Sequence, residues 1–280
     1  MKVFVFDTSI CNGCYCCQIA CKDEHCGNDW APYAKPQPET GQFWLKLSEY
    51  VRGSIPKVKV HYVAMLCNHC DEPICLDACE VEGAIYKRDD GLVVIDPEAC
   101  TGCTNCASAC PYHAIYMNDS LQIAQKCTGC AHLLDAGWSE PRCVDACPTG
   151  ALTFLEESEA AELIAGAEVL QPEKELLPRV YYRNLPKKFI AGTVYDPVRK
   201  EVIRGATCAL ARQAGADDGD TPPGDGVELT VKTDGFGDFW FEGLDIATYS
   251  LTIVADDFPA KGFSDLSTER DVNLGDIPLG

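Results

Sequence analysis

The stretch CTGCTNCASACP, residues 100–111, spaces its cysteines as CxxCxxCxxxC and ends on a proline. The stretch CNGCYCCQIAC, residues 11–21, repeats that spacing, and two looser copies at 67–79 and 127–147 keep an initial CxxC and a final CxxxC. This is an internal repeat of a ligand pattern. Its four quartets are Cys11, Cys14, Cys17, Cys21; Cys67, Cys70, Cys75, Cys79; Cys100, Cys103, Cys106, Cys110; and Cys127, Cys130, Cys143, Cys147.

Cysteines at this spacing are typical of iron–sulfur clusters. Three close cysteines on one loop bind three irons of a 4Fe–4S cube, and the fourth, which begins a helix or turn, points away to a neighbouring cube. Three of the CxxC pairs have a glycine directly before the second cysteine, namely Gly13, Gly102 and Gly129. The missing Cβ there lets the backbone approach the cluster. We therefore predict four 4Fe–4S clusters, or about sixteen irons.

A zinc site is the alternative for the fourth quartet. Its two separated pairs, at 127–130 and 143–147, suit the tetrahedral coordination of structural zinc. Zinc does not explain three thiolates within seven residues, which occur in both the first and third quartets. Iron–sulfur clusters therefore remain the interpretation we favour for all four quartets.

The exchange of fourth ligands predicts how the quartets pair. In the simplest hypothesis the repeats are nested, so that the middle two quartets exchange Cys79 and Cys110 and the outer two exchange Cys21 and Cys147. The predicted ligand sets are then Cys11, Cys14, Cys17, Cys147 for cluster 1; Cys127, Cys130, Cys143, Cys21 for cluster 2; Cys67, Cys70, Cys75, Cys110 for cluster 3; and Cys100, Cys103, Cys106, Cys79 for cluster 4.

Three cysteines and all five histidines lie outside these sets. Cys16 could replace Cys17 as a ligand, although the two-residue gap after Cys14 favours Cys17. We interpret Cys26 and Cys208 as small buried side chains. The quartets are complete without histidine, so the histidines near them are expected to be ordinary side chains and not ligands; they are His69, His113 and His132.

Composition excludes several classes of protein. The chain has 280 residues, 46% of them apolar, and a net charge of −20, which argues against nucleic acid or an anionic membrane surface as partner. Nineteen cysteines, an odd number, follow an N-terminus without a signal-peptide pattern, so a disulfide framework is not expected. We expect a cytoplasmic chain without a transmembrane segment, although export as the folded passenger of a signal-bearing partner stays open.

The remaining sequence predicts two domains and an α+β fold class. Short alternating segments surround the quartets, as in small ferredoxins, and residues 22–66 form an insertion with a hairpin. Residues 156–170 have the spacing of one exposed helix, and from Phe189 onward alternating segments between turns predict an all-β sandwich. A polar stretch from Arg212 to Gly226 is expected to be a loop, and no catalytic constellation is evident. The predicted domains are 1–185, with the four clusters in two pseudo-repeats, and 186–280.

The motifs around the cysteines carry a family resemblance. The sequences CKDEH at 21–25, CNHC at 67–70 and QKCTGCAH at 125–132 resemble those of the iron–sulfur electron-transfer subunits of dimethyl sulfoxide reductase-family molybdopterin enzymes. The resemblance covers residues 1 to about 185 and implies the nested ligand sets. It also implies a heterodimer with a large catalytic subunit, which would carry molybdenum or tungsten on bis-molybdopterin guanine dinucleotide, and a non-catalytic role for this chain.

A narrower resemblance extends to the C-terminus. The segments VYYRNL at 180–185 and TDGFG at 233–237 resemble the small subunits of pyrogallol–phloroglucinol transhydroxylases, which implies a transthyretin-like sandwich and a partner acting on phenolic rings by hydroxyl transfer, dehydroxylation or hydroxylation. Sixteen intact ligands suit net electron flow, through an external carrier where one is needed. The alternatives are an electron-transfer subunit of an anaerobic respiratory reductase with a non-aromatic substrate, and a structural scaffold.

Overall fold

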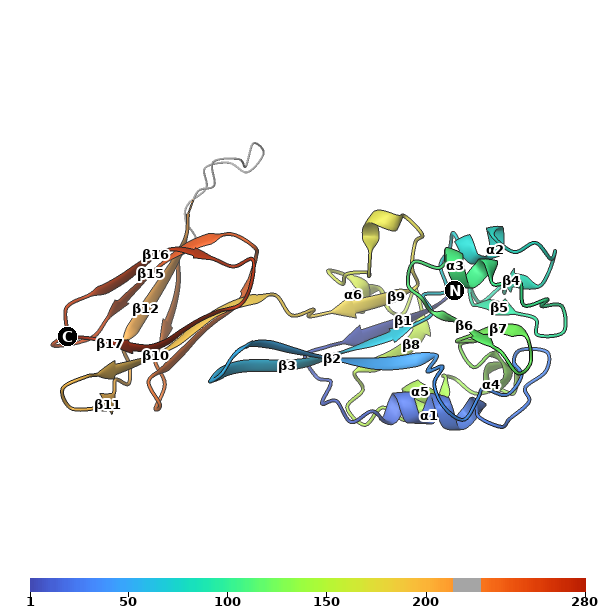
Figure 1. Ribbon diagram of the computed structural model, residues 1–280, viewed down its shortest axis with the longest axis horizontal. Helices are drawn as coiled ribbons and strands as arrows, with labels where there is room; N and C mark the ends of the chain where they lie inside the picture. The colour runs from blue at the N-terminus through green and yellow to red at the C-terminus, as the bar shows by residue number, and fades with distance from the viewer. Residues whose placement is uncertain (214–227) are drawn as a thin grey trace. The chain divides into compact units, whose positions relative to one another are not determined.

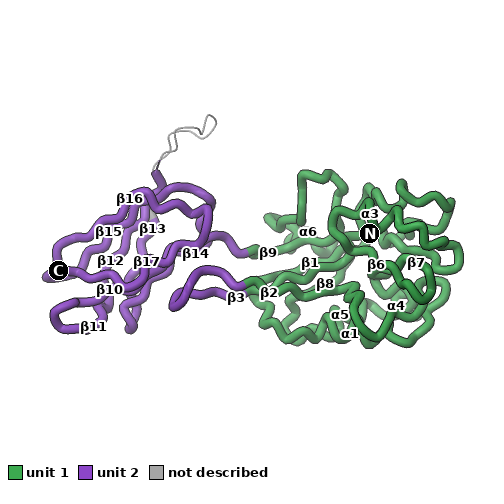
Figure 2. Tube along the Cα trace, viewed as in Figure 1, with its two compact units in different colours: residues 1–50, 61–185 green, residues 51–60, 186–280 purple. Residues whose placement is uncertain are grey.

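The computed structural model describes residues 1–213 and 228–280, which are mostly β-structure with short helices (Figure 1). The chain divides into two compact units, residues 1–50 with 61–185 and residues 51–60 with 186–280 (Figure 2). Most of the loop predicted between Arg212 and Gly226 falls outside the described residues. Within the two described ranges, no helix has the length and apolar character needed to cross a bilayer.

The first unit is built on a three-stranded sheet in the order β8-β1-β9. The N-terminal strand β1 (Lys2–Asp7) pairs antiparallel with β8 (Leu152–Glu156) and parallel with β9 (Val180–Arg183). Its sequence KVFVFD is apolar on both faces because both faces are buried. Phe4 and Phe6 join the main core, which contains many of the cysteines, and Val3 and Val5 pack with Ala160 on the other side.

Short elements arrange the cysteine loops around this sheet. Two small hairpins follow the second and third quartets, and the helices beside the cysteines have only one to three turns, which is too short for stability in isolation. These elements are β4 (Ile85–Lys87), β5 (Val93–Ile95), β6 (Ile115–Asn118), β7 (Ile123–Lys126), α1 (Cys16–His25), α2 (Ile74–Asp77), α3 (Asn105–Ala109), α4 (Ala131–Asp135) and α5 (Arg142–Asp145).

The prediction of one exposed helix over residues 156–170 is wrong. Strand β8 continues to Glu156, and the only α-helical turn that follows is α6 (Ala161–Ile164). Gly166 has a φ of +76°, a left-handed conformation that ends the helix, and Ala160 is fully buried against β1. A one-turn 3₁₀ helix (Pro172–Lys174) then leads to β9.

The predicted insertion contains a long hairpin of β2 (Leu45–Ser54) and β3 (Lys57–Leu66). Its tip, residues 51–60, belongs to the second unit. There Arg52 forms a salt bridge with Asp271, and Lys57, with 4% of its side chain exposed, forms one with Asp238. The hairpin is therefore not a part of the cysteine-rich unit alone.

The second unit has two sheets that share one apolar core. One sheet runs β11-β10-β14 with β17 also paired to β10, and the other runs β13-β12-β15-β16. Both contribute fully buried residues to the core, including Ile190, Phe239, Leu210 and Leu251. The strands are β10 (Lys188–Asp196), β11 (Glu201–Val202), β12 (Thr207–Arg212), β13 (Glu228–Lys232), β14 (Asp238–Leu244), β15 (Thr248–Val254), β16 (Lys261–Ser267) and β17 (Val272–Pro278).

Candidate metal centres

The first and third quartets have the same local backbone. In each, a glycine and the residue before the helix both take positive φ: Gly13 at +69° and Tyr15 at +62°, then Gly102 at +70° and Thr104 at +70°. These conformations wind the loop tightly and start a helix immediately after it. Neighbouring protein atoms also leave little room for a side chain at these glycines. A Cβ on Gly13 would lie 2.2 Å from the Tyr62 ring, and one on Gly102 would lie 2.2 Å from the Gln122 carbonyl oxygen.

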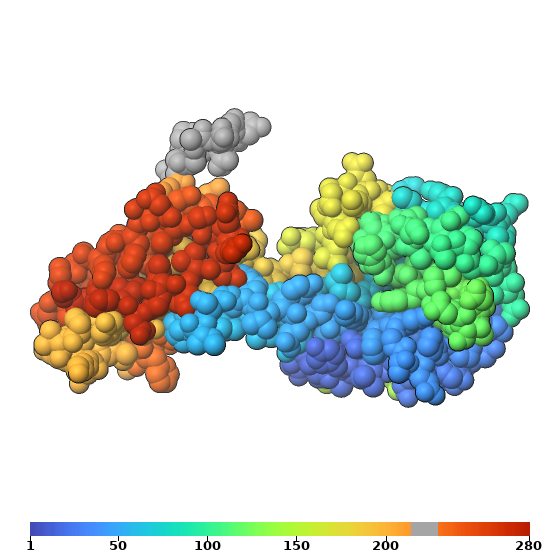
Figure 3. Space-filling view, viewed as in Figure 1, coloured from blue at the N-terminus to red at the C-terminus, as the bar shows by residue number. Residues whose placement is uncertain are grey.

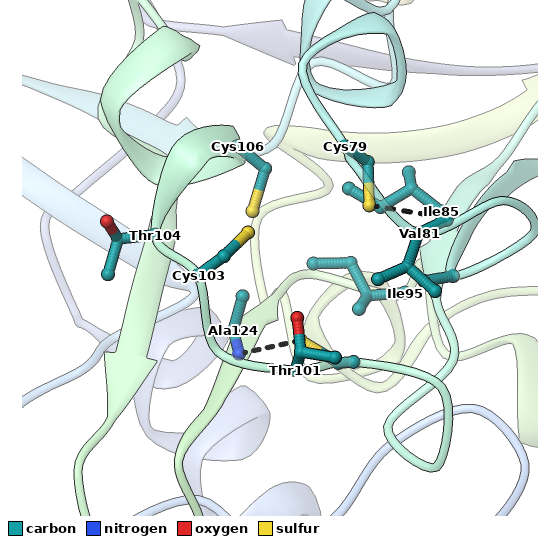
Figure 4. Close-up of a pocket in the computed structure, with 11 residues that line it drawn as sticks. Cys79, Val81, Ile85, Ile95, Thr101, Cys103, Thr104, Cys106 and Ala124 are labelled. Atoms are coloured by element: carbon teal, nitrogen blue, oxygen red, sulfur yellow. Dashed lines mark hydrogen bonds between the residues drawn. The ribbon is translucent and has the colours of Figure 1, made fainter.

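The two middle quartets exchange their last cysteines in space. One cavity is lined by Cys67, Cys70 and Cys75 together with Cys110 from the other quartet. A second cavity is lined by Cys100, Cys103 and Cys106 together with Cys79, and the sulfurs of Cys79, Cys103 and Cys106 point into a common space (Figure 4). Helices α2 and α3, which lie beside these cysteines, pack against each other.

The two outer quartets are arranged in the same way. Cys17 interacts electrostatically with Cys147, Cys11 and Cys14, and Cys21 interacts with Cys127 and Cys130. Cys143 in turn interacts with Cys130, Cys21 and Cys127. The contact between α1 and α5 brings these segments together, although they are more than 100 residues apart in the sequence.

The structure thus gathers sixteen cysteines into four groups, which keep these names below. They are group 1, Cys11, Cys14, Cys17, Cys147; group 2, Cys21, Cys127, Cys130, Cys143; group 3, Cys67, Cys70, Cys75, Cys110; and group 4, Cys79, Cys100, Cys103, Cys106. All nineteen cysteines lie in the described residues, and none of them forms a disulfide.

Burial and mutual repulsion raise the pKa of several of these thiols. Burial, followed by neighbouring cysteines, raises the pKa of Cys17, Cys70 and Cys130 to about 12 and that of Cys106 to about 11. Buried Cys21 and Cys143 have pKa values raised well above the usual range for the same two reasons. Four thiolates together therefore need metal ions to neutralise them, and soft thiolate donors suit iron–sulfur clusters.

Cys147 is different. Burial would raise its pKa, but hydrogen bonds from the backbone of Leu152 and from Thr149 outweigh burial and lower it. Neutral donors around a sulfur are a usual way of stabilising the thiolate, the form in which a cysteine binds a metal.

The arrangement disfavours zinc in the fourth quartet. A single ion needs its ligands around one point, whereas each cysteine of an iron–sulfur cube binds a different iron and the sulfurs stay farther apart. Cys147 interacts with Cys17 of the first quartet, so the fourth quartet does not close on itself.

The remaining cysteines and histidines fall into place around these groups. Cys16 is exposed, whereas Cys17 is buried and interacts with Cys11 and Cys147, which favours Cys17 over Cys16 as the ligand. Cys208 is fully buried in the core of the second unit, and Cys26 is half-buried. Of the histidines, His113 is exposed, and His132 is 3.1 Å from the carboxylate of Glu24.

Sequence reasoning assigned no role to two buried residues beside the cysteines. His25, one helical turn after Cys21 on α1, places its Nε2 3.9 Å from the sulfur of Cys130. Lys126, immediately before Cys127, is 2% exposed and interacts with a cysteine of group 3. The sequence contains one sign of a role for Lys126: it ends the segment that forms β7 and directly precedes a predicted ligand, Cys127.

Comparison with known proteins places these features in context. Residues 58–157 match the family described as a 4Fe-4S dicluster domain. The pyrogallol hydroxytransferase small subunit of Pelobacter acidigallici is 33% identical over 98% of this chain and 98% of its own length. A tetrathionate reductase subunit of Salmonella typhimurium is 34% identical over 66% of this chain and 73% of its own length. A subunit of the anaerobic dimethyl sulfoxide reductase of Escherichia coli is 34% identical over 64% of this chain and 83% of its own length.

Proposed function

Because this chain belongs to the family of iron–sulfur small subunits of molybdopterin enzymes, we propose that it relays single electrons through four 4Fe–4S clusters to or from a large catalytic subunit. The observation that supports the proposal is that the last cysteine of each quartet lies with the cysteines of another quartet, which gives four groups of four cysteines. Each bound cluster would supply a site that accepts and releases one electron.

The groups succeed one another in the order 1, 2, 3, 4. Cys17 and Cys21 lie one turn apart on α1 and belong to groups 1 and 2. Cys127 of group 2 interacts electrostatically with Cys67 of group 3, and Cys75 of group 3 interacts with Cys106 of group 4. Consecutive neighbours of this kind are what a linear path for electrons requires.

The two ends of this order reach the surface. Cys14 of group 1 and Cys103 of group 4 are exposed, whereas all four cysteines of group 2 are buried. Segments from both ends of the order, blue and green in Figure 3, contribute to the surface of the first unit. We infer that one end faces the pterin site of the large subunit and the other faces an external carrier where the reaction needs one.

We propose that the large subunit acts on phenolic rings and that the second unit is a transthyretin-like sandwich that docks on that subunit. The support is the extent of similarity: the pyrogallol hydroxytransferase small subunit matches 98% of the chain, while the two reductase subunits match 64–66% of it. The sixteen-cysteine set suits net electron flow, and therefore ring dehydroxylation or hydroxylation.

The test is anaerobic purification of the native complex, followed by metal analysis, reductive EPR and assays on phenols beside tetrathionate and dimethyl sulfoxide. We expect about sixteen irons in this chain, clusters that dithionite reduces, and turnover of a phenol. A stoichiometric complex without molybdenum or tungsten would contradict the proposed partner. About four irons or fewer, or clusters that dithionite does not reduce, would instead favour a structural scaffold.

A further inference from the structure

Group 3 has two buried nitrogen groups beside it that no cysteine ligand accounts for. They are the ammonium of Lys126, with 2% of the residue exposed, and the imidazole of His69, with 1% exposed. Polar groups this deeply buried are costly unless each finds a hydrogen-bond partner. Their partners in the structure therefore indicate what the two side chains are for.

All three hydrogens of the Lys126 ammonium have acceptors. One hydrogen bond goes to the carbonyl oxygen of Val93 and a second to the carbonyl oxygen of Cys127, at 3.1 Å. The third hydrogen is available to the sulfur of Cys67 in group 3, with which the ammonium interacts. Because a lysine has only three donors, the positive charge is held in one position with one donor aimed at a predicted cluster ligand.

Lys126 also faces cysteines of two groups. The ammonium interacts with Cys67, Cys75 and Cys127, and the two carbonyl oxygens that accept its hydrogen bonds suit a protonated lysine, which has three donors and no acceptor. Cys67 and Cys75 belong to group 3, and Cys127 belongs to group 2. The charge of Lys126 therefore interacts with two consecutive groups, and more of its cysteine partners belong to group 3 than to group 2.

His69 is held by the same residue, Val93, that accepts from Lys126. The backbone N–H of Val93 donates to Nδ1 of His69 at 3.0 Å, so Nδ1 acts as the acceptor and the proton of the neutral ring is on Nε2. Nε2 is buried and has no partner among the described side chains. His69 lines the cavity of Cys67, Cys70, Cys75 and Cys110. The unpartnered N–H thus belongs to a residue that borders the space where group 3 converges.

We propose that Lys126 and His69 are positioning residues that raise the reduction potential of the cluster held by group 3. An oxidised cube with four thiolates carries a charge of about −2 and a reduced one about −3. A fixed cation and an N–H donor stabilise the more negative form, so both residues favour reduction. The step adds one electron, which dithionite supplies in a titration, and no bond forms or breaks. This inference rests on the proposed function.

The test is an EPR-monitored redox titration of the purified complex. Lys126→Met removes the charge and keeps the chain length, and Lys126→Arg restores the charge. We expect Lys126→Met to lower the potential of the group 3 cluster by at least about 59 mV, a tenfold change in the ratio of reduced to oxidised cluster. The group 2 cluster should shift less, the clusters of groups 1 and 4 should stay unchanged, and Lys126→Arg should recover most of the difference. Cys70→Ser identifies which signal belongs to group 3.

Two substitutions separate the two nitrogens of His69. His69→Asn offers an oxygen in place of Nδ1, which keeps an acceptor for Val93, but has no group in place of Nε2. His69→Gln can place an N–H donor near the position of Nε2. We expect Asn to lower the potential of the group 3 cluster and Gln to retain it. These variants keep the test independent of Lys126→Met if that variant does not assemble.

The possible results distinguish failure of the proposed function from failure of the positioning role. If the wild-type complex contains no reducible clusters, the proposed function fails. If the wild type contains them, but Lys126→Met and His69→Asn assemble with unchanged iron and unchanged potentials, the positioning role is wrong. A shift of equal size in all four clusters would also overturn it, because that pattern reports a general change in folding. Loss of iron from both variants without any shift in the remaining group 3 signal would overturn it too, by assigning these residues to assembly alone.

Discussion

Replacing Cys147 with serine should damage the cluster of the first quartet, far away in the sequence, and spare the cluster of the fourth. Cys147 interacts with Cys11 and Cys17, which belong to residues 11–21, and four residues earlier Cys143 interacts with Cys130 and Cys21. Two cysteines one turn apart therefore serve different groups. The variant Cys143→Ser is the matched control, since it makes the same chemical change in the same segment.

The expected magnitude follows from one ligand in sixteen. Serine is a weaker ligand for iron than a thiolate, so Cys147→Ser should lose at least the one iron at that corner and at most the four irons of one cube, out of about sixteen. The other three clusters keep all their ligands. Iron per chain should therefore fall by about one to four, and one of the four EPR signals should change or disappear.

The assay is iron analysis and reductive EPR on four anaerobically purified variants. Cys147→Ser should affect the same signal as Cys11→Ser, and Cys143→Ser should affect the same signal as Cys21→Ser. The reasoning is refuted if Cys147→Ser and Cys143→Ser remove the same signal, because the fourth quartet would then hold a cluster by itself. Loss of all four signals in Cys147→Ser but not in Cys143→Ser would refute it as well, since only one group has a ligand at this position.

Three further predictions concern stability. Lys57→Met should lower the free energy of unfolding of the second unit by about 1–3 kcal/mol in urea at pH 7, because it leaves Asp238 without its buried cation. Burial would raise the pKa of Asp238, but Lys57 and Thr193 outweigh burial and lower it, so this stabilisation is present at neutral pH. The stability difference between wild type and Lys57→Met should therefore shrink as pH falls below about 4. An equal difference at pH 3 and pH 7 would contradict the ion pair. Gly102→Ala should cost several-fold more stability or cluster occupancy than Gly83→Ala. Both glycines have positive φ, but only at Gly102 would the new Cβ meet backbone, 2.2 Å from the Gln122 oxygen. Equal losses by thermal denaturation and iron analysis would refute the steric argument. Anaerobic removal of iron should lower the melting temperature of the first unit and leave that of the second unchanged, because only the first core contains the grouped cysteines; calorimetry that shows both transitions moving together would exclude this independence.

The sequence alone predicts four ligand groups because ligand spacing is a local property with few alternatives, and those ligand assignments stay predictions. The structure brings Cys79 beside Cys106 and Cys147 beside Cys17, as the nested scheme expects, while the identity of each group as a cluster stays a prediction. Relatives that are iron–sulfur subunits of molybdopterin enzymes confirm the family. The motifs succeed because they combine residue type with spacing, so few unrelated chains share them by chance.

Other features depend on contacts that no local pattern contains. Residues 156–170 have helical spacing, but strand pairing with β1 extends to Glu156 and leaves a single helical turn. The hairpin tip lies in the second unit because Arg52 and Lys57 meet acidic residues more than 180 positions later. Lys126 looks like one of many charged residues until folding buries it between two groups of cysteines. Tertiary burial decides each of these cases.

The exchange of cysteines between distant quartets also sets an order of biosynthesis. Groups 3 and 4 have all their predicted ligands once residue 110 has been synthesised, because their members lie between Cys67 and Cys110. Groups 1 and 2 begin at Cys11 and Cys21 but wait for Cys143 and Cys147. Because the chain is synthesised from its N-terminus, groups 1 and 2 stay incomplete for most of the synthesis of the first unit. If the groups bind clusters, iron insertion during synthesis would start at groups 3 and 4 and finish at groups 1 and 2. A chain truncated before residue 143 could then complete only groups 3 and 4.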